Sequence, residues 1–167
     1  RFLRLTIEKD TQVVFGTFHA FFYRILRQSG LYGHDSIIKE KEKYRLLRDI
    51  LKTFQIKFHE NTFLDEILSE ISLIKNKQTK ENHTSNVLED DIFHAVYAEY
   101  LRRMKIMNKI DFDDMVTKCY ELLLKDGNVL RKWQERFRYI LVDEFQDIND
   151  LQYQILKLLA QNHHNIF

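Results

Sequence analysis

Apolar residues recur at intervals of three and four along most of this chain, which is the spacing of an amphipathic helix. Proline is absent and only 4 residues are glycine, so the two strongest helix breakers scarcely interrupt the pattern. The pattern therefore predicts a succession of helices. They cover residues 18–28, 39–54, 61–75, 89–107, 111–125, 129–136 and 149–160.

Two short apolar runs do not fit the helical spacing. QVVFG at residues 12–16 and YILV at residues 139–142 are predicted to be buried strands. A strand needs neighbours in a sheet, and the chain supplies too few of them. We therefore expect a mainly α fold, in which a helical insertion is flanked by two short strands and a helix from an α/β domain.

Polar and glycine-containing segments separate the predicted helices. Residues 29–36 and 75–86 are expected to be loops, and Gly127 is expected to break the helical pattern. Thr17 and Asp111 stand where helix N-caps are favoured. A capped helix with an acidic first turn explains the run DFDDM at residues 111–115, and a metal cluster is the alternative interpretation.

The charge of the chain is nearly balanced, with 26 basic and 25 acidic residues and a net charge of +1. A chain of this kind does not bind nucleic acid by bulk electrostatics, so any DNA contact must come from a local patch. Basic residues gather at residues 39–48, 102–105 and 131–138. They are either solvated helix faces or candidate phosphate contacts.

The sequence carries no sign of export or of membrane insertion. Cys119 is the only cysteine, which excludes an internal disulfide and favours a reducing compartment. No apolar run is long enough to cross a bilayer, and residues 1–10 do not resemble a signal peptide. We expect a cytoplasmic protein with no membrane partner. The first residue is not methionine, which predicts a piece cut from a longer chain.

Two adjacent carboxylates, Asp143 and Glu144, follow the predicted strand at residues 139–142. A buried parallel strand would carry them to the edge at which open α/β sheets bind ligands. There, one acid could hold Mg²⁺. Its neighbour, pointing the other way on an extended backbone, could activate a water for nucleotide hydrolysis. The plain alternative is that the two acids only end a strand and begin a turn.

The longer string around these acids is more specific. VDEFQDINDLQYQILKLL, at residues 142–159, resembles motif II of the UvrD/PcrA/Rep family of superfamily 1 helicases. GTFHAFFYRILR at residues 16–27 resembles motif Ib of that family, and DFDDM resembles a further motif that precedes motif II. The resemblance covers essentially the whole chain. It implies that residues 1–17 and 137–167 belong to a RecA-like P-loop NTPase domain, called 1A, and that residues 18–136 form a helical insert resembling domain 1B.

The resemblance also implies a function and a set of site residues. The parent protein would be an ATP-dependent DNA helicase of the bacterial cytosol, with ATP and Mg²⁺ as cofactors and single-stranded and duplex DNA as partners. Asp143 would coordinate the Mg²⁺ of MgATP, and Glu144 would be the catalytic base. Gln146 would sense the nucleotide or couple it to DNA, and Asp147 would support that network in nucleotide binding. Ile148 stands where threonine is common in the family, a mild change that leaves the carboxylates untouched.

Thr17, Phe18 and His19 would lie along the path of single-stranded DNA. A hydroxyl, an aromatic ring and an imidazole at the start of a helix can contact phosphate and stack on bases. The alternative is that Thr17 is only a helix cap and Phe18 only part of the core.

One motif expected of a helicase is missing from the sequence, and several other interpretations stay open. The phosphate-binding motif G-x-x-x-x-G-K-[ST] is absent from the 167 residues, so the isolated chain is expected not to hydrolyse ATP. A RecB/AddA-type helicase–nuclease shares the same motifs. A non-catalytic DNA-binding module and a two-metal nuclease are the alternatives from other classes. Cys119 is expected to lie in the core, and His163 and His164 to be exposed loop residues.

Overall fold

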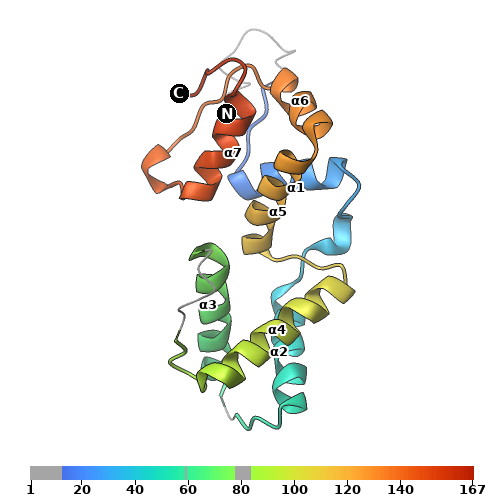
Figure 1. Ribbon diagram of the computed structural model, residues 1–167, viewed down its shortest axis with the longest axis vertical. Coiled ribbons are helices and arrows are strands. Elements are labelled where there is room, and N and C mark those ends of the chain that lie inside the picture. The colour runs from blue at the N-terminus through green and yellow to red at the C-terminus, as the bar shows by residue number, and fades with distance from the viewer. Residues whose placement is uncertain (1–12, 59, 78–83) are drawn as a thin grey trace, which may run out of the picture.

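The computed structural model describes residues 13–58, 60–77 and 84–167, and this part of the chain is mainly helical, as predicted (Figure 1). Two short 3-10 turns, η2 (His34–Ser36) and η3 (Phe145–Asp147), interrupt the connections. The α-helices are α1 (Phe18–Gln28), α2 (Glu40–Thr53), α3 (Asn61–Lys77), α4 (Asp90–Ile106), α5 (Phe112–Lys125), α6 (Gly127–Arg136) and α7 (Asp150–Ala160).

Capping groups place the helix ends within a few residues of the predicted ones. Gly127 does not break the pattern, because it is the first residue of α6. The break lies at Asp126, whose carboxylate accepts hydrogen bonds from the backbone N–H groups of Asn128 and Val129, at 3.0 and 3.1 Å. The loop predicted at residues 75–86 begins later than expected, since α3 continues to Lys77, and its residues 78–83 lie outside the described part.

The buried strand predicted at residues 12–16 is not found. Gln12 lies outside the described residues, and residues 13–16 have no regular structure. The side chains of Val13 and Phe15 are 53% and 65% exposed. The prediction of burial was wrong because an apolar run becomes a buried strand only beside other strands, and none pairs with it in the described residues.

The second predicted strand, residues 139–142, is paired but not buried. Ile140 forms a parallel bridge with Ile166: its N–H donates to the carbonyl of Asn165 at 2.9 Å, and its own carbonyl accepts from Phe167 at 3.0 Å. The side chain of Leu141, on the other face, is 79% exposed. Residues 139–142 therefore contribute only an isolated parallel bridge, and the prediction of a buried strand was wrong for the same reason as before.

The helices form two groups along the long axis of the molecule (Figure 1). The first core is built by α2, α3 and α4, and the second core by α1, α5, α6 and α7. Side chains at the centre of the first core include Leu47, Ile50, Leu51, Leu64, Ile67, Phe93 and Val96. Those at the centre of the second core include Phe22, Ile25, Leu26, Cys119, Trp133 and Ile155.

Backbone hydrogen bonds and a group of ion pairs connect the two cores. The N–H of Ile38 donates to the carbonyl of Ile110 at 2.9 Å, and that of Ile110 donates to Ser36 at 2.8 Å. Beside this bridge, the Lys75 Nζ of α3 lies 2.7 Å from Asp111 and 2.9 Å from Asp114. The side chains of Lys75 and Asp111 are only 6% and 5% exposed, so this is a buried ion cluster between α3 and α5.

The two acids of this cluster cap the start of α5, as the capped-helix interpretation predicted. Asp111 caps α5 by accepting from the N–H of Asp114 at 2.9 Å, and Asp114 accepts in return from the N–H of Asp111 at 3.1 Å. Burial alone would raise the pKa of Asp111, but the charge and hydrogen bond of Lys75 outweigh it and hold that pKa below its ordinary value.

Candidate functional site

The start of α1 presents the residues predicted to touch DNA. Thr17 has an extended backbone, and its hydroxyl oxygen accepts from the N–H of Ala20 at 3.3 Å, which confirms it as the helix cap. Phe18 is half-buried and packs against Phe22, with ring centroids 5.7 Å apart. His19 is half-buried in the same first turn, while Thr17 stays exposed.

The predicted nucleotide residues lie on a tight turn between the Ile140–Ile166 bridge and α7. Glu144 has a left-handed backbone, with φ 50° and ψ 47°, and its N–H donates to the Asp143 carboxylate at 3.1 Å. An extended backbone was expected to point the two acids in opposite directions, and that expectation was wrong. The turn is closed by Asp147, whose N–H donates to the carbonyl of Glu144 at 2.9 Å.

Side chains within this turn are linked to one another and to α7. The Gln146 amide donates to the Glu144 carboxylate. Asn149 caps α7 by accepting from the N–H of Gln152 at 2.9 Å. The ring of Phe145 meets Tyr153 edge-on at 6.0 Å. The carboxylate of Glu144 is thus held from one side by a neutral donor, while its charge remains exposed.

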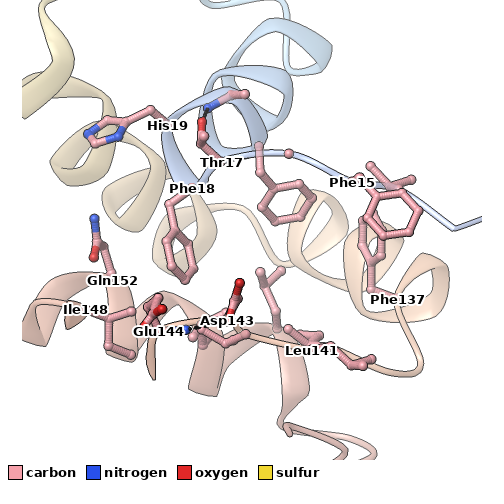
Figure 2. Close-up of a pocket in the computed structure, with 18 of the residues that line it drawn as sticks. Phe15, Thr17, Phe18, His19, Phe137, Leu141, Asp143, Glu144, Ile148 and Gln152 are labelled. Carbon is pink, nitrogen blue, oxygen red and sulfur yellow. Dashed lines mark hydrogen bonds between the residues drawn. The ribbon is translucent and has the colours of Figure 1, made fainter. Parts of the chain in front are cut away.

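An open cavity of about 510 Å³ brings the two segments together, although they are more than a hundred residues apart in the sequence. One wall is the segment from Val14 to Phe21, and the other is formed by residues of the segment 139–148 and by one side of α7 from Gln152 to Leu159. Figure 2 shows Phe18 reaching from α1 toward Asp143 and Glu144. The structure therefore places the predicted DNA residues and the predicted nucleotide carboxylates around one space.

Not every predicted residue faces this space in the same way. Asp143, Glu144 and Asp147 line the cavity, whereas Gln146 is exposed outside its lining. His19 points away from the carboxylates toward α5 (Figure 2). There its ring meets Phe112 edge-on, with centroids 5.5 Å apart.

Two residues near the site were missed by the sequence analysis. Phe112 is 56% exposed at the first position of α5, although it had been counted only as part of a capped helix. An aromatic residue directly after a helix cap, outside the apolar face, was the available signal. Arg24 also lines the cavity, and its spacing of seven from Thr17 places both on one side of α1.

Several other predictions about reactive groups can be compared with the structure. Cys119 is fully buried, and burial raises the pKa of its thiol to about 12, so it is a core residue. His164 is exposed as predicted, but His163 is half-buried, and its Nδ1 accepts from the N–H of Asn165 at 3.0 Å. In the described residues, no group of three or more acids, histidines or cysteines could hold a metal ion, which gives the two-metal nuclease no support.

The family of the chain follows from comparison with known proteins. The family model of the UvrD/REP helicase N-terminal domain matches residues 3–167. The chain therefore belongs to this family, as the motifs predicted.

Individual relatives agree with this assignment. The chain is 34% identical to YjcD of Bacillus subtilis over 164 residues, which cover 95% of the chain and 21% of that protein. It is 34% identical to a homolog of DNA helicase II from Mycoplasma pneumoniae over 191 residues, covering 100% of the chain and 25% of that protein. It is 32% identical to the ATP-dependent DNA helicase PcrA of Bacillus subtilis over 160 residues, covering 90% and 21%.

The chain spans a quarter or less of the length of these relatives. The names DNA helicase II and PcrA do not favour the helicase–nuclease interpretation. Within the described residues, no helix is both long and apolar enough to cross a membrane.

Proposed function

We propose that this chain is part of an ATP-dependent DNA helicase, which translocates on single-stranded DNA and unwinds duplex DNA during repair, replication or recombination. The observation that carries the proposal is the single cavity shared by Thr17, Phe18, Asp143 and Glu144. In a translocating motor, ATP hydrolysis must change the contacts with the DNA strand. Residues for both ligands that line one cavity are close enough for this coupling. The names of the relatives support the same activity.

Asp143 would hold Mg²⁺, and Glu144 would orient and deprotonate the attacking water. Mg²⁺ in nucleotide sites is bound by one or two carboxylates, with phosphate oxygens and water completing its shell. The exposed Asp143 carboxylate on the cavity wall fits that requirement. When bound, MgATP supplies the phosphoanhydride that is hydrolysed. Its phosphates need a cradle that the 167 residues do not encode, so that cradle would belong to another part of the parent protein.

Gln146 would act through Glu144. Its amide donates to the Glu144 carboxylate, so a shift of the turn would change the position of the base. Asp147 would support the turn, since its backbone N–H already bonds to the Glu144 carbonyl. These two residues are positioning residues in this proposal.

DNA would pass along the start of α1. Thr17 would contact a phosphate, and Phe18 would stack on a base. Because Phe18 faces Asp143 and Glu144 across the cavity, a shift of its ring on DNA binding would change the surroundings of these carboxylates (Figure 2). His19 would extend this surface toward Phe112, because the two rings already meet edge-on.

The proposed domain boundary is informed by the packing. Residues 18–136 were expected to form the insert, but α1, α5 and α6 pack with α7 in the second core. We therefore place residues 39–109 in the 1B-like insert and the remainder with the RecA-like domain. The bridge between Ile37 and Ile110 would be the point where the insert leaves and rejoins it.

The test is Glu144→Gln in the complete parent helicase. Loss of the base should reduce DNA-stimulated ATP turnover by about 10²–10⁴-fold, while binding of a fluorescent ATP analogue stays within twofold. Glu135→Gln on α6 makes the same chemical change at an exposed position and should leave both properties unaltered.

Unchanged turnover in Glu144→Gln would remove this residue from the catalytic role. Equal losses of nucleotide binding in Glu144→Gln and Glu135→Gln would point instead to a general effect on folding. Unwinding of a labelled duplex, measured in the same samples, links the ATPase result to the helicase activity.

A further inference from the structure

A second, smaller hollow of about 290 Å³ lies beside the C-terminal half of α1. Three of the residues that line it are arginines: Arg24 and Arg27 from α1, and Arg136 at the end of α6. The fourth is Gln28, whose amide adds a neutral donor. All four side chains are exposed. The helix contact between α1 and α6 therefore concentrates positive charge at one point of a chain whose net charge is only +1.

No carboxylate neutralises this charge within the described part of the chain. The ion pairs found there involve Lys75, Arg102, Arg103, Lys109 and Lys118, and none involves the three arginines of the hollow. Arg24 and Arg27 stand three residues apart on one helix, a spacing at which like charges repel. A binding partner that carries negative charge would relieve this repulsion.

Neutral neighbours nevertheless hold two of the guanidinium groups in place. Arg136 lies over the rings of Trp133 and Phe137, 5.4 and 5.8 Å from their centroids. The Arg27 Nη2 lies 2.7 Å from the His34 Nε2, which must accept this hydrogen bond because a guanidinium has only donors. The hollow is therefore partly pre-organised, which lowers the entropy lost when a ligand binds.

Guanidinium groups recognise phosphate oxygens through paired, parallel hydrogen bonds. A phosphodiester carries a single negative charge, so three guanidinium groups match several successive phosphates better than one. Arg24 also lines the large cavity that contains Thr17 and Phe18. The hollow thus continues, along one side of α1, the surface proposed to carry single-stranded DNA.

We propose that Arg24, Arg27 and Arg136 form a binding site for the sugar–phosphate backbone of a nucleic-acid strand, beyond the segment held by Thr17 to His19. The choice of DNA as the source of the phosphates rests on the proposed helicase function. The site positions the strand without reading its sequence, because it offers only phosphate contacts.

The test measures binding of a fluorescein-labelled oligothymidylate strand to the 167-residue chain by fluorescence anisotropy at several KCl concentrations. Arg24→Gln, Arg27→Gln and Arg136→Gln should each weaken binding several-fold. Each should also reduce the slope of log K against log[KCl] by about 0.7, the value for one lost phosphate contact on a single strand. Arg131→Gln is the matched control, because it removes the same charge from α6 outside the hollow and should change neither quantity.

A second measurement follows the arginine side-chain N–H signals by nuclear magnetic resonance as oligothymidylate or pyrophosphate is added. The strand should shift the signals of Arg24, Arg27 and Arg136. Shifts with pyrophosphate alone would overturn the proposal in favour of a small-anion site, and equal losses in Arg131→Gln would overturn it in favour of bulk charge. Absence of binding by the unaltered chain would contradict the DNA-binding part of the proposed function as well, whereas binding that survives all three substitutions contradicts only the new site.

Discussion

At the scale of single residues, the chain uses charge in two contrasting ways. The guanidinium groups around Arg24 have no acidic partner among the residues that the structure describes, whereas the Glu99 carboxylate on α4 is paired with two arginines. Its carboxylate accepts from the Arg102 Nε at 2.6 Å and the Arg103 Nε at 2.7 Å. Arg103 in turn donates to Thr53 at 3.2 Å, which ties α4 to the end of α2.

This arrangement predicts how stability changes in acid. The hydrogen bonds from Arg102, and then from Arg103, lower the pKa of Glu99 to about 2 from its usual 4.5. A lowered carboxyl pKa stabilises the fold fully above pH 4.5, and the stabilisation is lost as the pH falls toward 2. The urea midpoint of Glu99→Gln should therefore lie below that of the unaltered chain at pH 6, and the difference should vanish near pH 2.

The control for this experiment is Glu66→Gln, on the exposed side of α3. Its urea midpoint, followed by circular dichroism, should show no comparable dependence on pH. A difference between Glu99→Gln and the unaltered chain that persists at pH 2 would contradict the assigned cause.

At the scale of elements, the contact between α3 and α5 depends on the buried Lys75. Removing one partner from a buried ion cluster leaves the remaining charges uncompensated and costs about 3–5 kcal/mol. Lys75→Met should therefore lower the free energy of unfolding by that amount, measured by urea denaturation at pH 7. Lys118→Met breaks a more exposed pair with Glu121, 3.2 Å away, and should cost less than about 1 kcal/mol.

A cost in Lys75→Met no larger than in Lys118→Met would show that water reaches the cluster. The variant that combines Lys75→Met with Asp111→Asn and Asp114→Asn should recover part of the loss, because it leaves no isolated charge. The N–H acceptors of the cap would remain available in that variant through the amide oxygens.

The helices could be predicted from the sequence because their signals are local. Thr17 and Asp111 are N-cap residues that indicate where α1 and α5 begin, and the apolar spacing indicates which helix faces become buried. Lys75 was missed, although its spacing from Ile71 places a charged residue on a core face, which is itself a sign of a buried partner. Its acidic partners are distant in sequence, so no local pattern could identify them.

The residues proposed for the candidate site stand out in the sequence, but the shape of the site does not. Asp143 and Glu144 are recognisable within VDEFQD, whereas the left-handed backbone of Glu144 depends on the closing turn. The strands were predicted from apolar runs, and burial of such runs depends on neighbours that no local window contains. The arginine hollow joins α1 to α6, and only the tertiary packing brings these helices together.

At the scale of the whole molecule, the candidate carboxylates stand in a sequence of 167 residues that has no G-x-x-x-x-G-K-[ST] motif to bind phosphates. Positioning and neutralising the phosphates supply most of the catalysis in nucleotide hydrolysis. The purified 167-residue chain should therefore show no DNA-stimulated ATPase activity, measured as phosphate release, even at saturating Mg²⁺ and oligonucleotide. The complete parent protein, assayed in parallel, is the positive control, and robust turnover by the chain alone would contradict this division of the machinery.

The two cores differ in how much of the chain each one requires. The first core draws on a continuous stretch from Ile38 to Met104, whereas the second begins at Phe22 and is complete only with Leu159. During synthesis on the ribosome, all residues of the first core have been synthesised before α5 and α7, against which α1 packs in the second core. Once it forms, Ile38 and Ile110 are brought within bonding reach, and the loop that separates α1 from α5 becomes effectively short. Early formation of the first core would therefore lower the chain entropy that is lost when the second core closes around the candidate site.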